Sequence, residues 1–273
     1  MRTLARLFAA LAAAALVFLG VGYWNATRPP IVVAHEQRLP GLPPGSRIRV
    51  AVFADTHYGF PDMSGERLRG IVAQVNALKP DLILLAGDYH GGKLLDLAPS
   101  PRMEPAVEPF AALKAPLGVF AVMGNHDNSR WAPVVFAKQG EPKLLVNQRL
   151  DVGPLVVAGA NSVAHGSNIA GTLAGPGLEK PVLLILHEGD QLSHEERPPG
   201  LHILAFAGHT HGGQIILPFV GNVGKKVLGN SACWRGPCTI NGWPIIVTSG
   251  IGTSWLPIRY GVPPEILLIT LTP

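Results

Sequence analysis

Short apolar runs recur along the chain from residue 47 onward, and each run ends in residues with oxygen or nitrogen side chains. The runs are rich in Val, Ile and Leu and do not alternate with polar residues, which is typical of strands covered on both faces. They read IRVAVFADTHYG, DLILLAGDYH, GVFAVMGNHD, PVLLILHEGD and ILAFAGHTHGG. The pattern therefore predicts buried strands that each carry a polar group at the carboxyl end.

A helix is predicted between the first two runs, in the segment MSGERLRGIVAQVNALKP. Its apolar residues recur at helical spacing over residues 68–78, Ser64 is placed to cap the start, and Pro80 marks the exit. Weaker helical patterns cover residues 103–113 and 129–139. Strands that alternate with helices favour a parallel arrangement, in which ligand sites lie beyond the carboxyl ends of the strands.

After Lys143 the helical pattern fades, and short strands are joined by turns rich in Gly and Asn. These strands are expected at residues 144–147, 155–158, 215–217, 245–249 and 265–270. We therefore expect the α/β class, as a four-layer α/β/β/α sandwich of two mixed sheets with flanking helices. A single doubly wound sheet would not accommodate the strand-rich second half.

The N-terminal segment Leu7–Trp24 carries no charge and follows Arg2 and Arg6. Its length of about 18 residues is just enough to span a bilayer as a helix, and the arginines favour an N-terminus that stays in the cytoplasm. A cleaved secretory signal is the rival, but no clean small-residue cleavage site follows, so an uncleaved transmembrane helix is favoured. The expected location is the cell membrane, single-pass with the folded domain outside the cytoplasm. An exported soluble form is expected if residues 1–28 are cleaved.

Three segments are therefore expected: an anchor or signal sequence at 1–28, a Pro-rich tether at 29–46 and a folded domain at 47–273. Within the tether, Ile31–Val33 could add an edge strand. Hydrophobic residues make up 47% of the chain, which is ample for a well-packed core. Cys233 and Cys238 would form a disulfide in an oxidising compartment and stay thiols in a reducing one; their spacing does not match a zinc site.

The charge pattern bears on possible partners. The formal net charge is +4, but Lys and Arg are scattered, with no basic helix and no interleaving of basic and aromatic residues. A nucleic-acid partner is therefore not expected. We expect a monomer.

Side chains at the ends of the apolar runs offer oxygen or imidazole nitrogen, and none of them offers a thiolate. Such donors suit manganese, iron, zinc or nickel, and the set is too large for one ordinary ion. If Asp88 is shared between two ions, each ion receives four protein ligands. Paired ions of this kind activate a bridging water and hydrolyse phosphate esters. The set consists of Asp55, His57, Asp88, Asn125, His187, His209 and His211.

The same residues form ordered blocks: D-x-H at 55–57, G-D at 87–88, G-N-H-D at 124–127, a lone His187 and G-H-x-H at 208–211. This order resembles the calcineurin-like metallophosphoesterases over residues 47–270. The ending GHTHGGQ and the terminal SGIGTSWLPIRYGVPPEILLITL resemble the membrane-anchored or exported bacterial branch of that family.

The resemblance implies two divalent ions, taken from manganese, iron or zinc. It assigns the first ion to Asp55, His57, Asp88 and His211, and the second to Asp88, Asn125, His187 and His209. It further implies that His126 is catalytic and stabilises or protonates the leaving oxygen, with Asp127 orienting its ring.

The implied function is a binuclear metal-dependent phosphoesterase that hydrolyses a phosphodiester or pyrophosphate through a metal-bridging hydroxide. Apolar loops beside a membrane anchor are compatible with a lipid-linked substrate. One alternative is a non-catalytic metal-binding scaffold on the same fold, which the complete ligand set disfavours. The other is a nuclease, which the absence of a basic groove pattern disfavours.

Further residues are expected near the site or away from it. His90 and Lys93 follow the G-D block and are expected as substrate contacts, and Trp234 and Trp255 as a substrate wall. The remaining histidines are expected to be structural; these are His35, His165, His194 and His202.

Overall fold

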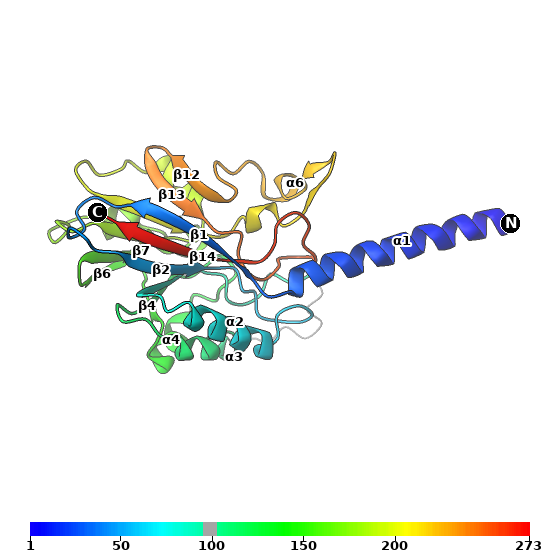
Figure 1. Cartoon of the computed structure of the whole chain (residues 1–273), viewed down its shortest axis with the longest axis horizontal. Helices are drawn as coiled ribbons and strands as arrows, with labels where there is room; N and C mark the ends of the chain where they lie inside the picture. Colours follow the sequence, from blue (N-terminus) through cyan, green and yellow to red (C-terminus); the bar gives the residue numbers. More distant parts are fainter. Residues whose placement is uncertain (95–102) are drawn as a thin grey trace.

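Two six-stranded mixed sheets pack face to face in the structure, a computed structural model that describes residues 1–94 and 103–273. Helices cover the outer faces, and one long helix projects from an end of the domain (Figure 1). Three separate clusters of buried apolar side chains lie between the resulting layers. The predicted four-layer sandwich is confirmed.

The first sheet has the strand order β1-β14-β2-β3-β4-β5. Neighbouring strands are parallel except for the antiparallel pair β14 and β2. The carboxyl ends of β2, β3 and β4, where the polar blocks begin, therefore meet at one edge. The strands are β1 (Ile31–Arg38), β2 (Ile48–Phe53), β3 (Leu82–Leu85), β4 (Val119–Ala121), β5 (Lys143–Leu144) and β14 (Glu265–Thr272).

The second sheet has the strand order β12-β13-β9-β8-β7-β6, and its four central strands are parallel. A separate two-stranded hairpin, β10 (Ile216–Leu217) and β11 (Gly221–Asn222), follows β9. The larger sheet consists of β6 (Gln148–Val152), β7 (Leu155–Gly159), β8 (Val182–Ile185), β9 (Ile203–Ala207), β12 (Gly236–Ile240) and β13 (Trp243–Val247).

The helix α2 (Gly65–Ala77) begins as predicted, because the Ser64 side chain accepts a hydrogen bond from the Arg67 amide. Together with α2, the short helices α3, η1 and α4 cover the first sheet, while η2, α5 and η3 lie on the second-sheet side of the chain. Their bounds are α3 (Glu104–Val107), η1 (Glu108–Ala112), α4 (Ala132–Gln139), η2 (Val163–His165), α5 (Ile169–Thr172) and η3 (Gly189–His194). Two further short helices are η4 (His211–Gly213) and α6 (Lys225–Leu228).

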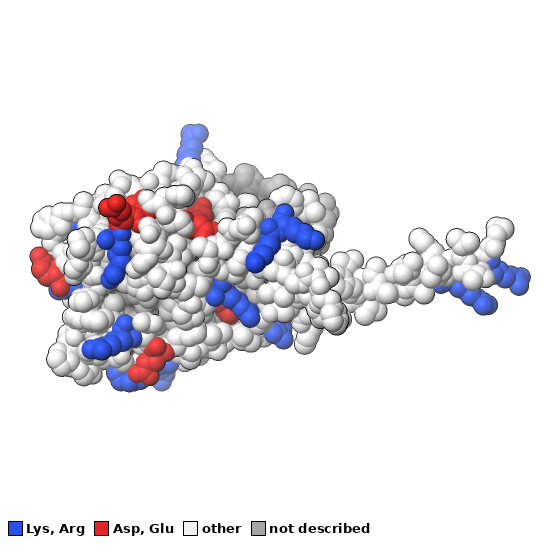
Figure 2. All heavy atoms as spheres, turned by 90° about the horizontal axis from the view of Figure 1, so that it is seen from above, with Lys and Arg blue, Asp and Glu red and all other residues white. Residues whose placement is uncertain are grey.

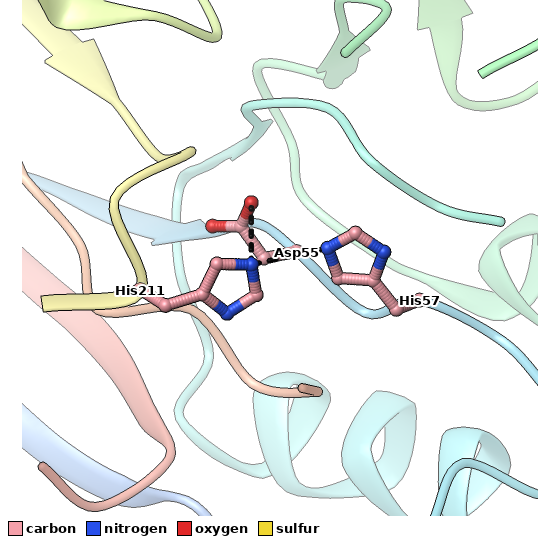
Figure 3. A group of neighbouring side chains, drawn as sticks. All are labelled: Asp55, His57 and His211. Atoms are coloured by element: carbon pink, nitrogen blue, oxygen red, sulfur yellow. Dashed lines mark hydrogen bonds and ion pairs between the residues drawn. The ribbon is translucent and has the colours of Figure 1, made fainter. Parts of the chain in front are cut away.

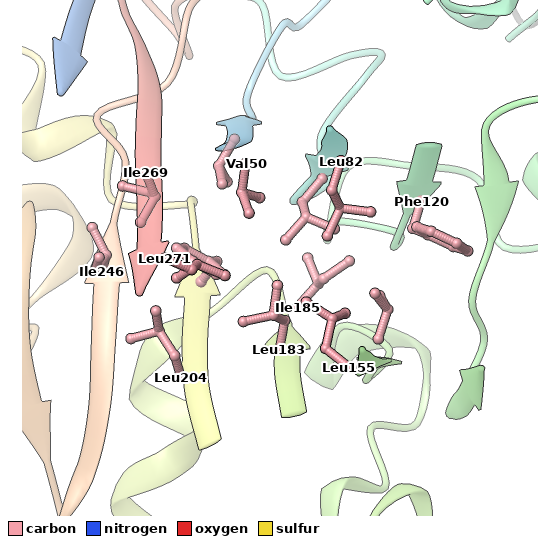
Figure 4. Packing of buried hydrophobic residues seen from close by; sticks show 14 of the residues in the cluster. Val50, Leu82, Phe120, Leu155, Leu183, Ile185, Leu204, Ile246, Ile269 and Leu271 are labelled. Carbon is pink, nitrogen blue, oxygen red and sulfur yellow. The ribbon is translucent and has the colours of Figure 1, made fainter. Parts of the chain in front are cut away.

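The largest apolar cluster lies between the two sheets (Figure 4). Val50, Leu82 and Phe120 reach into it from the first sheet, and Leu183 and Leu204 from the second. Burying one such side chain stabilises the fold by roughly 1.5–3 kcal/mol. The shared core fixes the two sheets relative to each other, so the carboxyl ends of their parallel strands face a common edge.

The N-terminal helix α1 (Arg2–Thr27) is long and apolar enough to cross a membrane. Its most apolar 18-residue window has a mean hydropathy of 2.3 and is 0% buried, which excludes a core helix. After α1, β1 pairs with β14 over its whole length. The expected edge strand at Ile31–Val33 therefore exists and extends to Arg38. A disulfide joins Cys233, in the loop before β12, to Cys238 within β12.

Candidate functional site

All of the side chains singled out at strand ends lie at the common edge of the two sheets. Two of the polar blocks follow β2 and β3, a third follows β4, and the last two follow β8 and β9. The parallel arrangement within each sheet brings these strand ends together, although the residues are up to 156 positions apart in the chain. They form two adjacent groups.

The first group consists of Asp55, His57 and His211, whose ligand atoms all lie within 4.8 Å of one another (Figure 3). The Nε2 atoms of His57 and His211 are 3.1 Å apart, and His211 Nε2 lies 3.7 Å from Asp55 Oδ1. All three residues are buried. Two imidazole nitrogens and a carboxylate at this spacing form a ready set of donors for one divalent cation.

The second group consists of Asp88, His187 and His209, also within 4.8 Å of one another. Asn125 joins it, because its Oδ1 lies 3.1 Å from His187 Nε2 and 3.0 Å from His209 Nδ1. Asp88 lies between the groups: its Oδ2 is 3.2 Å from His187 Nε2 and 3.5 Å from His57 Nε2. The structure thus brings all the expected ligand residues together, with the second aspartate at the centre.

Backbone carbonyls orient two of the rings. The Nδ1–H of His57 donates to the Gly91 carbonyl at 2.8 Å, and the Nδ1–H of His187 donates to the Ala86 carbonyl at 2.7 Å. A carbonyl only accepts, so Nδ1 carries a proton in each ring, and Nε2 is the nitrogen that faces the site. Such partners are typical of metal-ligating histidines.

The strand-end residues adopt a backbone conformation that side chains other than glycine rarely adopt. Left-handed backbone at a non-glycine residue costs free energy, and it clusters where the surrounding structure uses it for function. The side chains that adopt it are ones that meet in the two groups. The residues are Asp55 (φ 56°), His57 (φ 43°), Asp88 (φ 58°), His209 (φ 71°) and His211 (φ 51°).

Glycine is required where the backbone passes against the two carboxylates. A Cβ added at Gly124 would lie 2.1 Å from Asp88 Oδ1, and one at Gly208 would lie 2.6 Å from Asp55 Oδ2. Both distances are shorter than any real contact, so a side chain at either position would displace a carboxylate. The glycines of the G-N-H-D and G-H-x-H blocks are thus explained by close approach.

The electrostatics of the site favour a cation. Burial raises the pKa of the Asp55 carboxyl to about 7, lowers the pKa of His57 to about 3 and holds that of His211 well below its usual value. Burial also opposes the charged forms of Asp88 and His187, but their mutual attraction outweighs it, lowering the pKa of Asp88 and raising that of His187. Around Asp55 and Asp88, the lowered pKa values keep the imidazoles of His57 and His211 neutral, and buried carboxylates beside neutral rings require positive charge nearby. The donor set therefore fits divalent ions of the manganese, iron or zinc type.

Arg259 is a buried residue at the site that the sequence patterns did not indicate. Its Nη2 donates to the carbonyls of Gly252 at 2.6 Å and Ser249 at 2.8 Å, and lies 3.4 Å from His211 Nδ1. Burial lowers its pKa to about 10, so the guanidinium stays charged at neutral pH. It ties the loop after β13 to the back of the His211 ring.

The position of Asp127 differs from the expectation that it orients the His126 ring. Its Oδ2 accepts the amides of Gly124 at 2.8 Å and Asp88 at 2.9 Å, and its Oδ1 accepts that of Tyr89 at 2.9 Å. Buried amides in two loops need an acceptor, and a carboxylate satisfies several at once. Asp127 is therefore a positioning residue that joins the Asp88 loop to the loop after β4.

His126 lies at the mouth of the site, on a cavity of about 340 Å³. Its side chain is exposed, its ring centroid is 5.4 Å from that of His57, and its own amide donates to Asp88 Oδ1 at 2.9 Å. The cavity floor includes Asp88, Asn125 and His209, and its wall is apolar. The wall residues are Leu94, Ile215, Val223, Trp255 and Leu256.

The two tryptophans that were expected to form a substrate wall differ in position. Trp255 lines the cavity, whereas Trp234 is not among the described residues that do so. The Trp234 carbonyl instead accepts a hydrogen bond from Thr210 Oγ1 at 2.6 Å. Trp234 thus supports the loop that carries His209 and His211 from behind.

Lys93 and His90 were expected to contact substrate, but neither is among the described residues that line the cavity. The Lys93 side chain is 1% exposed, and its Nζ lies 2.6 Å from Asp62 Oδ1 and 3.2 Å from Thr253 Oγ1. Burial lowers its pKa to about 8. The expectation for Lys93 is wrong because a buried carboxylate from a separate loop takes its charge.

Replacing Lys93 tests this structural role. Lys93→Ala leaves the fully buried Asp62 carboxylate without its closest cation, and we expect the free energy of unfolding to fall by roughly 3–5 kcal/mol. Urea titration of the full chain in detergent measures the loss. The double variant Asp62→Asn/Lys93→Met should recover most of it. A raised KM for phosphate esters with unchanged stability would instead restore Lys93 as a substrate contact.

Comparison with known proteins agrees with this geometry. Residues 48–219 match the calcineurin-like phosphoesterase family. The metallophosphoesterase YkuE of Bacillus subtilis (strain 168) is 29% identical over 280 residues, covering 97% of this chain and 94% of that protein. A metallophosphoesterase of Aquifex aeolicus (strain VF5) is 28% identical over 243 residues, covering 84% of this chain and 87% of that protein.

A third relative is the transmembrane protein with metallophosphoesterase domain of Bos taurus. It is 29% identical over 219 residues, covering 71% of this chain and 47% of that protein, so the chain spans about half the length of the bovine relative. The family match covers most of the chain and includes the residues of both groups. The chain belongs to the calcineurin-like phosphoesterase family of metal-dependent phosphoric ester hydrolases.

Proposed function

We propose that the chain binds two divalent ions and hydrolyses a phosphodiester or a pyrophosphate. The observation that carries this proposal is the position of Asp88, whose carboxylate lies within 3.5 Å of a histidine from each group. One ion would be held by Asp55, His57, Asp88 and His211. The other would be held by Asp88, Asn125, His187 and His209.

Divalent ions held by these residues would supply the charge that binds the phosphate oxygens and the acidity that activates water. The chain itself directs the ester into the cavity and protonates the leaving group. As the bond from phosphorus to the leaving oxygen breaks and a bond to the water oxygen forms, His126 gives a ring proton to the leaving oxygen. Its exposure to the cavity, beside both donor groups, supports this role.

A catalytic function is favoured over a metal-binding scaffold, because the donor set is complete and His126 is not needed to complete it. A nuclease is disfavoured by the surface charge. On the face shown in Figure 2, basic and acidic side chains are scattered and form no continuous basic groove. Nucleic-acid binding depends on such a groove.

We further propose that α1 is retained as a single membrane span, with the domain outside the cytoplasm. The end of α1 makes specific contacts: Arg67 Nη2 donates to the Ala26 carbonyl at 2.7 Å and Tyr23 Oη to the Pro61 carbonyl at 2.9 Å. If α1 were removed as a signal peptide, the mature protein would lack these contacts. The disulfide Cys233–Cys238 suits an oxidising compartment, and the bovine relative is named a transmembrane protein.

Metal content and substrate choice test the proposed function. The full chain in detergent, loaded with manganese, zinc or iron, should retain about two ions after dialysis. It should hydrolyse bis(p-nitrophenyl) phosphate faster than p-nitrophenyl phosphate. Elemental analysis and release of p-nitrophenolate measure the two. One ion per chain or fewer, or hydrolysis of neither diesters nor pyrophosphates with any of the metals, would contradict the proposal.

A further inference from the structure

The end of α1 is joined to the loop that forms part of the cavity wall. The rings of Phe18 and Tyr260 stack with their centroids 4.5 Å apart, and the Tyr260 hydroxyl donates to the Phe18 carbonyl. The Arg259 amide donates to the Gly22 carbonyl at 3.0 Å. A Cβ added at Gly22 would lie 2.8 Å from the Cβ of Ile258, so the helix backbone packs directly on this loop.

These contacts place the loop at the depth of the apolar segment of α1. Phe18 precedes Trp24, the last residue of that segment, by six residues, which is about 9 Å along a helix. A ring stacked on Phe18 therefore lies well inside the level at which α1 enters a bilayer. With α1 spanning a bilayer as proposed, Tyr260 would bring its loop, which carries Trp255 and Leu256, close to the membrane surface.

Exposed apolar side chains gather around this loop, and we refer to them as the apolar rim. Single exposed apolar residues are ordinary, but a continuous set beside a polar site marks an interface. The rim consists of Phe60, Leu94, Phe219, Val220, Trp255 and Leu256, all exposed.

Hydrogen bonds hold the parts of the rim together. The Leu94 amide donates to the Trp255 carbonyl at 3.0 Å, and the Ile216 amide donates to the Tyr260 carbonyl at 2.8 Å. The second bond fixes the β10–β11 hairpin, whose turn carries Phe219, to the loop that contacts α1. The helix α6, which follows this hairpin, lies at the end of the domain from which α1 leaves (Figure 1).

The rim and the cavity share residues. Leu94, Trp255 and Leu256 belong to both, and the cavity ends at Asp88 and His126. An apolar path thus connects the membrane side of the domain to the donor groups. On the same side, exposed Lys225 and Lys226 in α6 are suited to anionic headgroups.

We infer that the apolar rim lies in the surface layer of the bilayer that holds α1, and that the substrate is a membrane-resident amphiphile. Its phosphoester enters the cavity while its hydrocarbon stays on Leu94, Trp255 and Leu256. This inference rests on the proposed function, because it names the substrate class of the same site. The bilayer is the expected occupant of the rim, since α1 holds the rim against it.

Two diesters that differ only in chain length test the inference: ethyl and hexadecyl p-nitrophenyl phosphate. In both, water replaces p-nitrophenolate on phosphorus. The full chain is placed in vesicles of phosphatidylcholine and phosphatidylglycerol that contain no other protein, with manganese. Its kcat/KM should be at least about tenfold higher for the hexadecyl ester than for the ethyl ester. Burying two methylene groups already accounts for a factor of this size.

A pair of matched variants separates membrane contact from general damage. Phe219 has φ 65°, so Phe219→Asn keeps a residue that tolerates this backbone while removing the apolar ring. It should lower turnover of the hexadecyl ester roughly fivefold or more and leave that of the ethyl ester unchanged. Leu150→Asn, at an exposed site on β6 at the opposite end of the domain (Figure 1), should change neither.

The outcomes are distinct. Hydrolysis of the ethyl ester without preference for the hexadecyl ester would overturn the inference and leave the proposed function intact. Equal effects of Phe219→Asn and Leu150→Asn would also overturn it, since the rim would then have no special contact with the bilayer. Hydrolysis of neither ester would overturn the inference, and an assay of pyrophosphates on the same preparation would then decide the proposed function.

Discussion

Asp88→Asn is expected to lower kcat/KM for bis(p-nitrophenyl) phosphate by far more than 100-fold and to leave at least one metal position empty. In the parent chain, Asp88 Oδ2 is the only carboxylate oxygen among the described residues that lies within 3.5 Å of a histidine from each donor group. An amide removes the negative charge that two cations would share. Loss of an outer partner of a ligand already costs 10–100-fold, and a shared ligand should cost more. Elemental analysis and steady-state kinetics measure both losses.

Two controls define the result. Asp55→Asn affects a residue of the first group alone and should retain more metal than Asp88→Asn. Asp151→Asn changes an exposed carboxylate on β6 that pairs with Lys180, and it should change neither metal content nor kcat/KM. Full metal content in Asp88→Asn, with a circular dichroism spectrum like that of the parent chain, would contradict a shared role for this residue.

Much of the site was predictable because its chemistry stands at the ends of regular elements. The runs before Asp55, Asp88 and His209 are apolar on both faces, which identifies parallel strands, and parallel strands end at a common edge. This rule brings together the strand ends within one sheet. The core shared by the two sheets brings the two sets of strand ends to one edge.

The remaining features depend on contacts between distant residues that no local pattern reveals. Lys93 follows a metal-binding block and looks available to substrate, but its partner Asp62 lies 31 residues earlier. The Asp127 carboxylate serves amides 38 and 39 residues away. β1 pairs with β14 across almost the whole chain, so only the start of that strand was visible in the sequence. In each case a buried polar group or an open sheet edge forms its hydrogen bonds with a residue that is distant in the chain but close in the fold.

The second large effect is expected from His126→Ala, which should lower kcat by roughly 100-fold or more while metal content stays at its parent value. The ring of His126 belongs to neither donor group, and its amide, which donates to Asp88 Oδ1, survives the substitution. Metal binding and proton donation are therefore separable at this residue. Kinetics and elemental analysis of the same preparation measure both.

The dependence on the leaving group distinguishes proton donation from a merely structural role. A phenolate needs a proton more than a p-nitrophenolate does, because it is the stronger base. The loss caused by His126→Ala should therefore be larger for phenyl than for p-nitrophenyl esters, whereas a displaced loop would slow both equally. Asp127→Asn is the matched case of a displaced loop, since its carboxylate holds backbone amides. Unchanged kcat on both esters in His126→Ala would mean that the leaving oxygen takes its proton from another donor.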